Sequence, residues 1–360
     1  MGELWNGLLA GRSGIAPVDR FPTGSYVTGL AAEVPGLAAE GSGSRFERLL
    51  DLLLADFGPV PEGTWLVTAS TKGKIDALEH LRRGQPCRTE DLWLRAVTVA
   101  VAERLGLPVD GSVNINAACA SSTIALAQAA ARIASGRAAA ALVVAADIVS
   151  EFVFSGFSAL KALSPGGARP FDRDRDGLTL GEGACALLLV GDALARRLDP
   201  GPRVRITGWG VANDAHHITA PDREGSGLRL AVGAALAEAG RASTDLCGIC
   251  AHGTGTVYND AMELTAFRAV FEARVPPAFS VKGALGHTLG AAGALEAAIG
   301  AEALLAGRVP PTVRLGAPDA LGEGIISGAP VAITGDHLLT TNSGFGGVNA
   351  ALILSREEQT

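Results

Sequence analysis

The chain has 360 residues, of which 48% are hydrophobic and only 5% aromatic, so it can bury a large core as one big α/β unit or as two fused halves. Its net charge of −7 comes without long runs of one sign, which argues against the basic stripe of a nucleic-acid-binding protein. Five cysteines, no apolar leader and no apolar run long enough to cross a bilayer predict a cytoplasmic protein without structural disulfides and without a membrane partner.

The first predicted element is an amphipathic helix that begins at Met1 and ends before Gly11. Its apolar positions at helical spacing are Leu4, Trp5, Leu8 and Leu9. Glycine, serine and proline predict a loop over residues 33–44, and a helical period returns over residues 46–57. The next predicted elements are a strand over residues 65–70, a helix over 91–105, and buried strands over 140–146, 184–190 and 203–209.

Cys119 is predicted to lie at the turn between a short apolar strand, which begins at Asn114, and an alanine-rich helix over residues 124–135. Unpaired N–H groups and the helix dipole place partial positive charge at a helix start, which favours a thiolate over a thiol. Cys119 is therefore a candidate nucleophile. The alternative for this stretch taken alone is a buried, inert cysteine that closes the strand.

His252 is predicted to lie at a second strand end, because it follows an apolar strand over residues 248–251 and has glycines beside it. Asn259 and Asp260 can cap a helix that begins near Ala261. Exposed strand ends of this kind commonly carry functional side chains. We therefore treat His252 as a candidate partner of the cysteine.

Lys282 and His287 flank another glycine turn, and the run over residues 290–293 allows close backbone approach at the head of the following helix. The chain then returns through a glycine-rich loop over residues 341–349 around a single aromatic residue, Phe345. Such a loop can move and can offer backbone hydrogen-bond donors.

The second half of the chain repeats the plan of the first. Residues 114–137 run from a strand through a turn into an alanine-rich helix, and residues 279–308 do the same around His287. This repetition predicts two similar α/β halves, over residues 1–198 with the cysteine and 199–360 with the histidines and the lysine. A site is expected where the two turns converge.

Cys247 and Cys250 form a Cys-x-x-Cys pair, a spacing that also occurs in zinc and redox sites. They lie on a predicted apolar strand, and the sequence has no second cysteine pair. We therefore expect no metal site.

Five motifs occur in order along nearly the whole chain. They are Ala118-Cys119-Ala120, Arg169-Pro170-Phe171-Asp172 with Gly181-Glu182-Gly183, His252-Gly253-Thr254-Gly255-Thr256, Lys282 with Gly286-His287, and Gly344-Phe345-Gly346-Gly347. Together they resemble the elongating β-ketoacyl-acyl-carrier-protein synthases. The resemblance implies the thiolase-like fold, a duplicated αβαβα layered sandwich, which agrees with the internal repeat.

The resemblance implies a decarboxylative Claisen condensation in fatty acid or polyketide-type biosynthesis. In this family an acyl group is held on the residue that matches Cys119, and a malonyl group loses carbon dioxide to give the attacking carbanion. His252 and His287 would donate hydrogen bonds to the developing enolate oxygen, and Lys282 would orient them. Further matches are Gly344 and Phe345 for the oxyanion hole and gate, Glu296 as a supporting carboxylate, and Phe157, Thr254 and Thr256 for substrate binding.

The resemblance also implies partners. No metal ion or redox cofactor is expected, because the substrates are carried on the phosphopantetheine arm of acyl carrier protein. Since that carrier is acidic, Arg45, Arg48 and Lys161 resemble docking cations, although each could equally be an ordinary solubilising charge. A homodimer, or a heterodimer with a ketosynthase-like subunit, is expected through the sheet edge beside Cys119.

Three features depart from the family pattern. The family's first strand, taken as a central strand of the first sheet, is missing ahead of the helix at Met1. The loop between Lys72 and Asp91 is short, and Ser343 stands where a second phenylalanine is common, which predicts a wider or looser gate over Cys119.

Two alternatives stay open. The first is a weakly active or non-catalytic ketosynthase-like partner subunit, which the missing strand favours and the retained Cys119 opposes. The second is a coenzyme A-dependent enzyme of the thiolase superfamily. It is disfavoured because two histidines with a lysine suit decarboxylation, whereas thiolases pair a second cysteine with a histidine.

Overall fold

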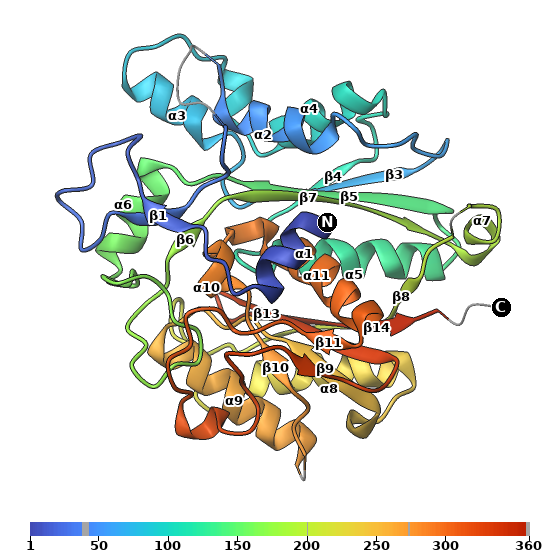
Figure 1. Cartoon of the computed structure of the whole chain (residues 1–360). Coiled ribbons are helices and arrows are strands. Elements are labelled where there is room, and N and C mark those ends of the chain that lie inside the picture. Colours follow the sequence, from blue (N-terminus) through green and yellow to red (C-terminus); the bar gives the residue numbers. More distant parts are fainter. Residues whose placement is uncertain (38–42, 200, 273, 358–360) are drawn as a thin grey trace.

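The structure is a computed structural model that describes residues 1–37, 43–199, 201–272 and 274–357. Two β-sheets face each other across a layer of helices, and further helices cover both outer faces (Figure 1). This arrangement confirms the layered αβαβα fold that was predicted from the motifs.

The sheet of the first half has the strand order β4-β3-β5-β7 among the described residues. Its strands are β3 (Trp65–Ala69), β4 (Val113–Ile115), β5 (Ala140–Asp147) and β7 (Gly183–Val190). β4 and β5 run parallel to β3, and β7 runs antiparallel to β5. Every residue of β5 is buried, as expected for a strand that is covered on both faces.

The sheet of the second half has the strand order β10-β9-β13-β14-β8. Its strands are β8 (Val204–Asn213), β9 (Leu246–Cys250), β10 (Ala278–Phe279), β13 (His337–Gly344) and β14 (Val348–Arg356). β10 and β13 run parallel to β9, and β14 runs antiparallel to β13. The two sheets therefore share one pairing pattern, in agreement with the repeat in the sequence.

Helices α5 (Ser121–Ala134) and α11 (Ala292–Ala306) form the layer between the sheets. Each helix contacts strands of both sheets, and the two helices contact each other. They lie very close together at Gly293, where an added Cβ would lie 1.9 Å from Thr123 Oγ1. The small residues of both helices thus let the two turns at their starts lie side by side.

Helices α2 (Arg45–Leu54), α3 (Ile75–Arg82) and α4 (Arg95–Leu105) cover the outer face of the first sheet, whereas α8 (Ser226–Ala239) and α9 (Val257–Phe271) cover that of the second (Figure 1). Shorter elements complete the chain. They are α6 (Glu151–Ala159), α7 (Asp192–Ala195), α10 (Lys282–Leu285), η1 (Thr89–Leu92), η2 (Ser243–Asp245), η3 (Leu289–Ala291), η4 (Ala320–Gly322), β1 (Ile15–Pro17), β2 (Leu30–Ala32), β6 (Leu180–Gly181), β11 (Arg308–Val309) and β12 (Val331–Ala332).

The predicted N-terminal helix is present as α1 (Gly2–Leu9), and it buries Trp5 and Leu8 in a cluster that also contains Ile299 of α11. The segment Leu289–Ala306 is apolar enough to cross a membrane. However, 72% of this segment is buried inside the protein, as is usual for a core helix.

Two predicted helix starts are wrong. α4 begins at Arg95 rather than at residue 91, because residues 89–92 form a separate 3-10 turn. α9 begins at Val257 rather than near Ala261. Asp260 does not cap the helix, because its buried carboxylate accepts hydrogen bonds from the backbone of residues 171, 254 and 255. The boundary between the halves after residue 198 remains a prediction.

The position of β7 shows that the prediction of a missing central strand in the first sheet is wrong. β8 is the edge strand of its sheet and pairs with β14, and no described residue takes the equivalent place beside β7. The absent strand therefore corresponds to an edge strand, not to a central one.

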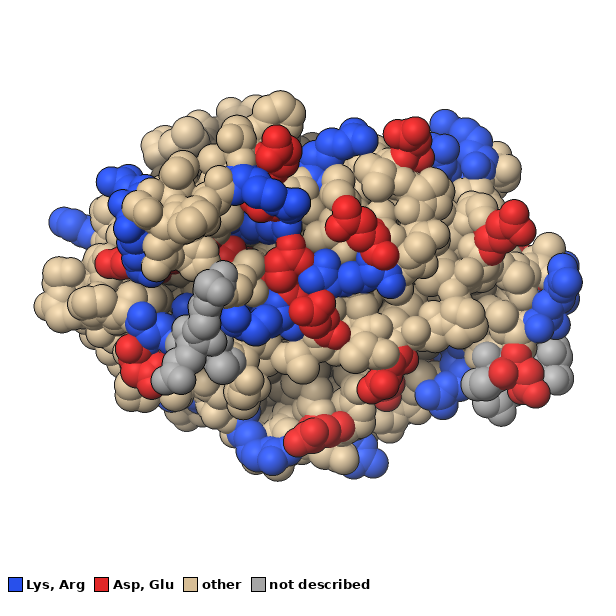
Figure 2. Space-filling model, turned by 90° about the horizontal axis from the view of Figure 1, so that it is seen from above, with Lys and Arg blue, Asp and Glu red and all other residues tan. Residues whose placement is uncertain are grey.

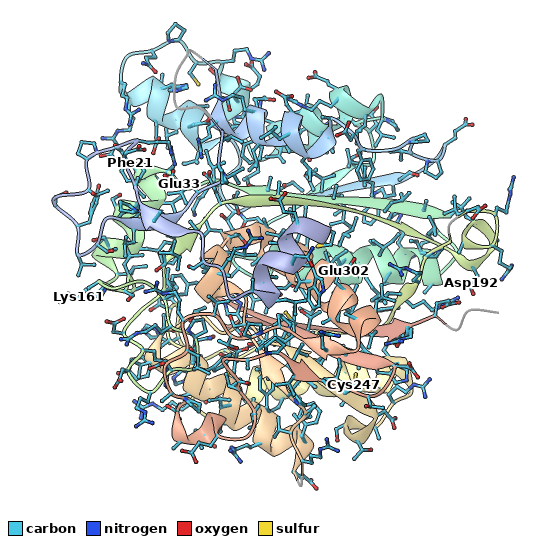
Figure 3. All side chains as sticks on the ribbon, in the orientation of Figure 1. Phe21, Glu33, Lys161, Asp192, Cys247 and Glu302 are labelled. Atoms are coloured by element: carbon cyan, nitrogen blue, oxygen red, sulfur yellow. The ribbon has the colours of Figure 1, made fainter. Side chains whose placement is uncertain are left out.

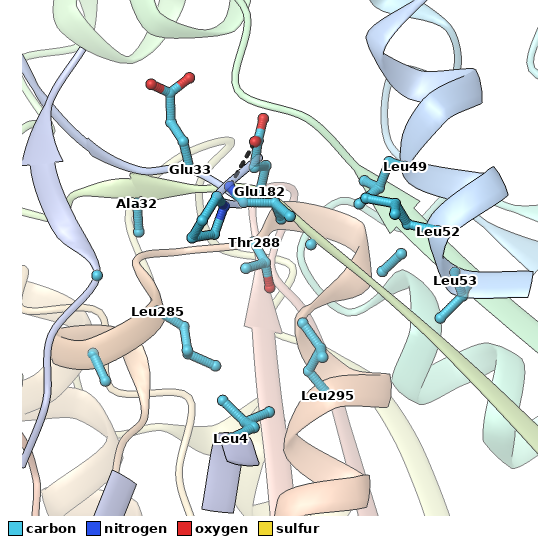
Figure 4. Close-up of a pocket in the computed structure, with 16 residues that line it drawn as sticks. Leu4, Ala32, Glu33, Leu49, Leu52, Leu53, Glu182, Leu285, Thr288 and Leu295 are labelled. Atoms are coloured by element: carbon cyan, nitrogen blue, oxygen red, sulfur yellow. Dashed lines mark hydrogen bonds between the residues drawn. The ribbon is translucent and has the colours of Figure 1, made fainter. Parts of the chain in front are cut away.

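A pocket of about 450 Å³ lies beside the start of β7, lined mainly by apolar side chains such as Leu4, Leu52 and Leu295 (Figure 4).

Candidate active site

The backbone before α5 holds Cys119 in a tight turn. Ala118 adopts a left-handed conformation with φ of 49°, which is uncommon for a residue with a side chain. The Ser121 hydroxyl fixes this turn, because it accepts a hydrogen bond from Ala117 N at 2.9 Å and donates one to Ala118 O at 2.5 Å. As predicted, Cys119 thus lies at the start of a buried helix, and only 7% of its surface is exposed.

The proton affinity of Cys119 differs from the expectation based on the helix start. Burial raises the pKa of the Cys119 thiol to about 12, although the nearby Lys282 charge and a hydrogen bond from the Phe345 backbone N–H act in the opposite direction. Removal of a thiolate from water outweighs the partial charge at the helix end. The resting group is therefore a thiol, and it must lose its proton when it reacts.

The two predicted histidines lie beside this sulfur. His252 follows β9, and His287 follows α10. His287 Nε2 is 2.9 Å from Cys119 Sγ, and the two imidazole rings meet edge to face with centroids 5.2 Å apart. Burial and the charge of Lys282 keep the pKa of both histidines well below the usual value, so both rings are neutral near pH 7.

Lys282 lies behind His252 and is almost fully buried. Its Nζ contacts His252 Nδ1 at 3.2 Å and also bonds His252 O and Glu296 Oε1. The other oxygen of Glu296 accepts a hydrogen bond from Asn342 Nδ2 at 2.6 Å. The lysine charge is therefore balanced by a buried carboxylate, and Lys282 lies on the Nδ1 side of His252.

The backbone of the loop after β9 is held by Glu263 of α9. Its carboxylate accepts hydrogen bonds from His252 N at 2.7 Å and from Gly253 N at 2.6 Å. Thr254 and Thr256 follow in the same loop, with their hydroxyl oxygens 2.9 Å apart. Both threonines line the pocket that contains Cys119.

This pocket has a volume of about 380 Å³ and is lined by Cys119, His252, His287 and the loop between β13 and β14. Gly344, the last residue of β13, packs against the nucleophile turn, where an added Cβ would lie 3.1 Å from Cys119 N. Phe345 follows and stacks on the ring of Phe157 with centroids 5.8 Å apart. The aromatic pair thus lies beside the sulfur, with Phe345 partly exposed.

Ser343 adjoins the same loop, and its hydroxyl donates to Asn349 Oδ1 at 2.6 Å. Asn349 Nδ2 in turn donates to Asp214 Oδ1 at 2.8 Å. Ser343 therefore belongs to a chain of hydrogen bonds that holds the start of the loop. The wider or looser gate that was predicted from this residue remains a prediction.

The three predicted docking cations lie in different environments. Arg45 is only 6% exposed and forms an ion pair with Glu182, so its prediction as a docking residue is wrong. Arg48 lies half-buried on α2. Acidic and basic side chains are mixed over the face of the molecule that Figure 2 shows. Lys161 is exposed, lines the mouth of the cysteine pocket and points outward beside α6 (Figure 3).

Three further residues of the site were missed in the sequence. Asn342 and Thr123 link β13 to α5 by a buried side-chain hydrogen bond. Asp147, at the end of β5, accepts hydrogen bonds from Ser70 Oγ at 2.7 Å and from Gly290 N at 2.7 Å, and so joins the two halves. Asp147 is the single polar residue of the otherwise apolar strand β5, and this was the available signal for it. Asn342 lies among other polar residues of β13, so the strand offered no such signal.

The side chains also define what the site could bind. The potential ligand atoms of Cys119, His252 and His287 lie within 4.8 Å of one another, a spacing that could hold one metal ion. The charge of Lys282 beside them opposes a bound cation. Cys247 and Cys250 lie in an apolar cluster, and the Cys247 thiol donates to His337 O at 3.1 Å.

Sequence comparison finds two family matches. Residues 64–195 match the β-ketoacyl synthase N-terminal domain, and residues 204–316 match the β-ketoacyl synthase C-terminal domain. The 3-oxoacyl-[acyl-carrier-protein] synthase 2 of Vibrio cholerae is 31% identical, in an alignment that covers 98% of this chain and 94% of that protein.

Solved structures show the same similarity. The ishigamide ketosynthase/chain length factor matches with a TM-score of 0.88 and 29% identity, over 99% of this chain and 95% of that chain. A β-ketoacyl synthase from Burkholderia phymatum matches with a TM-score of 0.86 and 29% identity, over the same shares of the two chains.

Proposed function

The chain belongs to the β-ketoacyl synthase family, and on this basis we propose that it is an elongating β-ketoacyl-acyl-carrier-protein synthase. It would join an enzyme-bound acyl group to a malonyl unit with loss of carbon dioxide. The observation that carries this proposal is the meeting of one sulfur and two neutral imidazoles, from three distant segments, at one buried pocket.

In the first step, the sulfur of Cys119 attacks the thioester carbonyl of the acyl carrier, and the pantetheine thiol leaves. The proton lost from Cys119 ends on the departing sulfur. His287 Nε2, at 2.9 Å from the sulfur, is the group that can take up and pass on this proton. The backbone N–H groups of Cys119 and Phe345 would stabilise the charge that develops on the carbonyl oxygen.

In the second step, the malonyl thioester loses carbon dioxide and negative charge develops on its thioester oxygen. His252 and His287 would donate hydrogen bonds to this oxygen, and as neutral groups in a buried site they need no prior ionisation. The resulting carbanion attacks the acyl carbonyl and a carbon–carbon bond forms. The bond between the acyl carbon and Cys119 Sγ breaks, and the departing thiolate takes up a proton from water.

The pocket suits a substrate on a long, flexible arm. Thr254 and Thr256 offer hydroxyl groups along the pocket wall, and Lys161 offers a positive charge at its mouth. We propose that they bind the pantetheine arm and an acidic acyl carrier protein, respectively. The enzyme would need no metal ion or redox cofactor.

We also propose that the enzyme works as a dimer in the cytoplasm. β4 is the edge strand of the first sheet, and it leads directly to the Cys119 turn. The matched ishigamide protein pairs a ketosynthase with a chain length factor, so the partner could be an identical copy or a ketosynthase-like subunit. All five cysteines are unpaired, which supports a reducing compartment.

A non-catalytic partner subunit is the less favoured function. Such a subunit does not need a cysteine in contact with an imidazole, yet here Cys119 Sγ and His287 Nε2 are 2.9 Å apart. A thiolase-type enzyme is also less favoured, because two histidines lie beside the sulfur and Lys282 pairs with Glu296 behind His252.

The test is release of labelled carbon dioxide from malonyl-acyl carrier protein. A His252→Ala, His287→Ala double variant should lose decarboxylation by at least about 10²-fold, since removal of one oxyanion donor typically costs about 10²–10³-fold. His80→Ala, on α3, serves as the control and should keep the wild-type rate. Unchanged decarboxylation in the double variant would rule out this mechanism.

A further inference from the structure

Asn342 lies near the end of β13 with its side chain fully buried behind His252. Its Nδ2 is 2.6 Å from Glu296 Oε2 and 3.1 Å from His252 Nδ1. Its Oδ1 accepts a hydrogen bond from the hydroxyl of Thr123 on α5. One amide thus connects the helix of the nucleophile, the supporting carboxylate and one of the two imidazoles.

The chemistry of these partners fixes the orientation of the amide. An ionised Glu296 can only accept hydrogen bonds, so the nitrogen of Asn342 must face it. Thr123 has a hydroxyl hydrogen to donate, which suits the amide oxygen on the other side. Both Nδ2 hydrogens then have partners, one on Glu296 Oε2 and one on His252 Nδ1.

This orientation determines where His252 carries its proton. A neutral imidazole has one donor and one acceptor nitrogen, and a nitrogen that accepts a hydrogen bond cannot also be protonated. Asn342 and Lys282 both donate to Nδ1, so the proton lies on Nε2. By contrast, His287 Nδ1 is buried without a hydrogen-bond partner among the described residues, so no contact on that nitrogen fixes the tautomer of His287.

Asn342 and Lys282 are not equivalent donors. Lys282 Nζ shares its three hydrogens among His252 Nδ1, His252 O and Glu296 Oε1. Asn342 is neutral, and its amide is anchored at both ends by Thr123 and Glu296. It therefore holds the ring in one tautomer without adding to the positive charge beside it.

We propose that Asn342 is a positioning residue that fixes the Nε2–H tautomer of His252 and so makes His252 a hydrogen-bond donor in the pocket. The consequence for catalysis rests on the proposed function. The tautomer itself is a property of the resting protein.

Two variants separate tautomer control from a structural role. In Asn342→Asp the group has the same shape, but an ionised carboxylate can accept both from Nδ1–H and from Lys282 Nζ. Lys282 then no longer keeps Nδ1 as an acceptor, and the proton would move away from Nε2. Decarboxylation should then fall by about 10²–10³-fold, the effect of a lost oxyanion donor. In Asn342→Ala, Lys282 still donates to Nδ1, so the loss should be about tenfold or less.

Thr340→Val is the matched control. Thr340 lies on the same strand and on the same face as Asn342, and its buried hydroxyl has no hydrogen-bond partner among the described residues. This variant should decarboxylate at the wild-type rate. Thermal unfolding of each variant reports whether it is folded. If only His252 is affected, the rate of acyl loading onto Cys119 should change by less than about threefold in every variant.

The decisive measurement is the ¹⁵N NMR spectrum of His252 in the full-length resting enzyme. The wild type should show a protonated Nε2 and a bare Nδ1, and Asn342→Asp should show the reverse. A protonated Nδ1 in the wild type, or equal decarboxylation losses in the Asp and Ala variants, would overturn the proposal. If Asn342→Asp does not fold, the test uses Asn342→Ala and Thr123→Val instead. The proposal is contradicted if both of these variants keep a single Nε2–H tautomer of His252 and decarboxylate at the wild-type rate. A wild type that shows this tautomer but releases no carbon dioxide would contradict the proposed function alone.

Discussion

Burial has opposite effects on the proton affinities of the sulfur and of the imidazoles in the pocket. It raises the pKa of Cys119 and lowers the pKa of His252 and His287, because in each case the uncharged form is favoured away from water. A resting pair of thiolate and imidazolium is therefore disfavoured. The sulfur becomes a nucleophile only when a substrate arrives and its proton is transferred.

Alkylation of Cys119 should therefore depend strongly on pH. Because the pKa of Cys119 is about 12, the thiolate fraction at neutral pH is small. The labelling rate with iodoacetamide should rise by about tenfold per pH unit between about pH 6 and pH 9, since only the thiolate reacts. Mass spectrometry of the modified peptide measures this rate, and a Cys87→Ser background removes the half-buried thiol of Cys87.

A labelling rate that levels off below pH 9 would show that the thiol ionises more easily than its burial implies. In that case the helix start, Lys282 and the Phe345 N–H would outweigh the loss of hydration. The histidines should not titrate in this range, since their pKa values lie well below 6.5.

The contact between α5 and α11 determines whether the two halves can share one site. At Gly293 the second helix lies against Thr123, and an added Cβ would be 2.7 Å from Thr123 N as well as 1.9 Å from its hydroxyl. The atom 2.7 Å away belongs to the backbone, so the helices cannot relax by a side-chain rotation alone. Thr123 also donates to Asn342, so the same contact supports His252.

Gly293→Ala should therefore separate α5 from α11 and destabilise the protein by about 3 kcal/mol or more, as overpacked and strained core sites do. Gly233→Ala is the matched control, because Gly233 is an exposed glycine of α8 with no atom within 4 Å of an added Cβ. That change should stabilise the protein by up to about 1 kcal/mol through helix propensity. Urea unfolding followed by circular dichroism compares the two variants, and equal stability would refute the packing argument.

Features that are local in sequence could be predicted, and features that depend on distant partners could not. The turn at Cys119 and the repeated strand–turn–helix unit follow from short-range periodicity. Arg45 was wrongly predicted to be a docking residue because its ion-pair partner Glu182 is 137 residues away in the sequence. Asn342 was missed because its partner Thr123 is 219 residues away and nothing in the sequence joins them.

At the scale of the whole molecule, the two large sheets share one pairing pattern but have different edges. In the second sheet, β8 covers the outer edge of β14 along its length. In the first sheet, β7 pairs with β5 on one side, and in the described part of the chain no strand pairs with the other side. The leucines of α2 that line the pocket beside β7, including the exposed Leu52, lack the strand on which α8 packs in the other half (Figure 4).

This difference predicts unequal hydrogen exchange in β7 and β14. In an antiparallel pair only every second residue of a strand bonds to its neighbour, so about half of the β7 amides between Gly183 and Val190 should point to the free edge and exchange quickly. Amides of β14, which has a partner on each side, should all exchange slowly. Exchange followed by NMR resolves the individual amides, and the β5 amides serve as a slow reference because β5 is paired on both sides. If the alternate β7 amides were as slow as those of β14, a further strand from outside the described residues would cover this edge in solution, because no acceptor in the described residues could protect them.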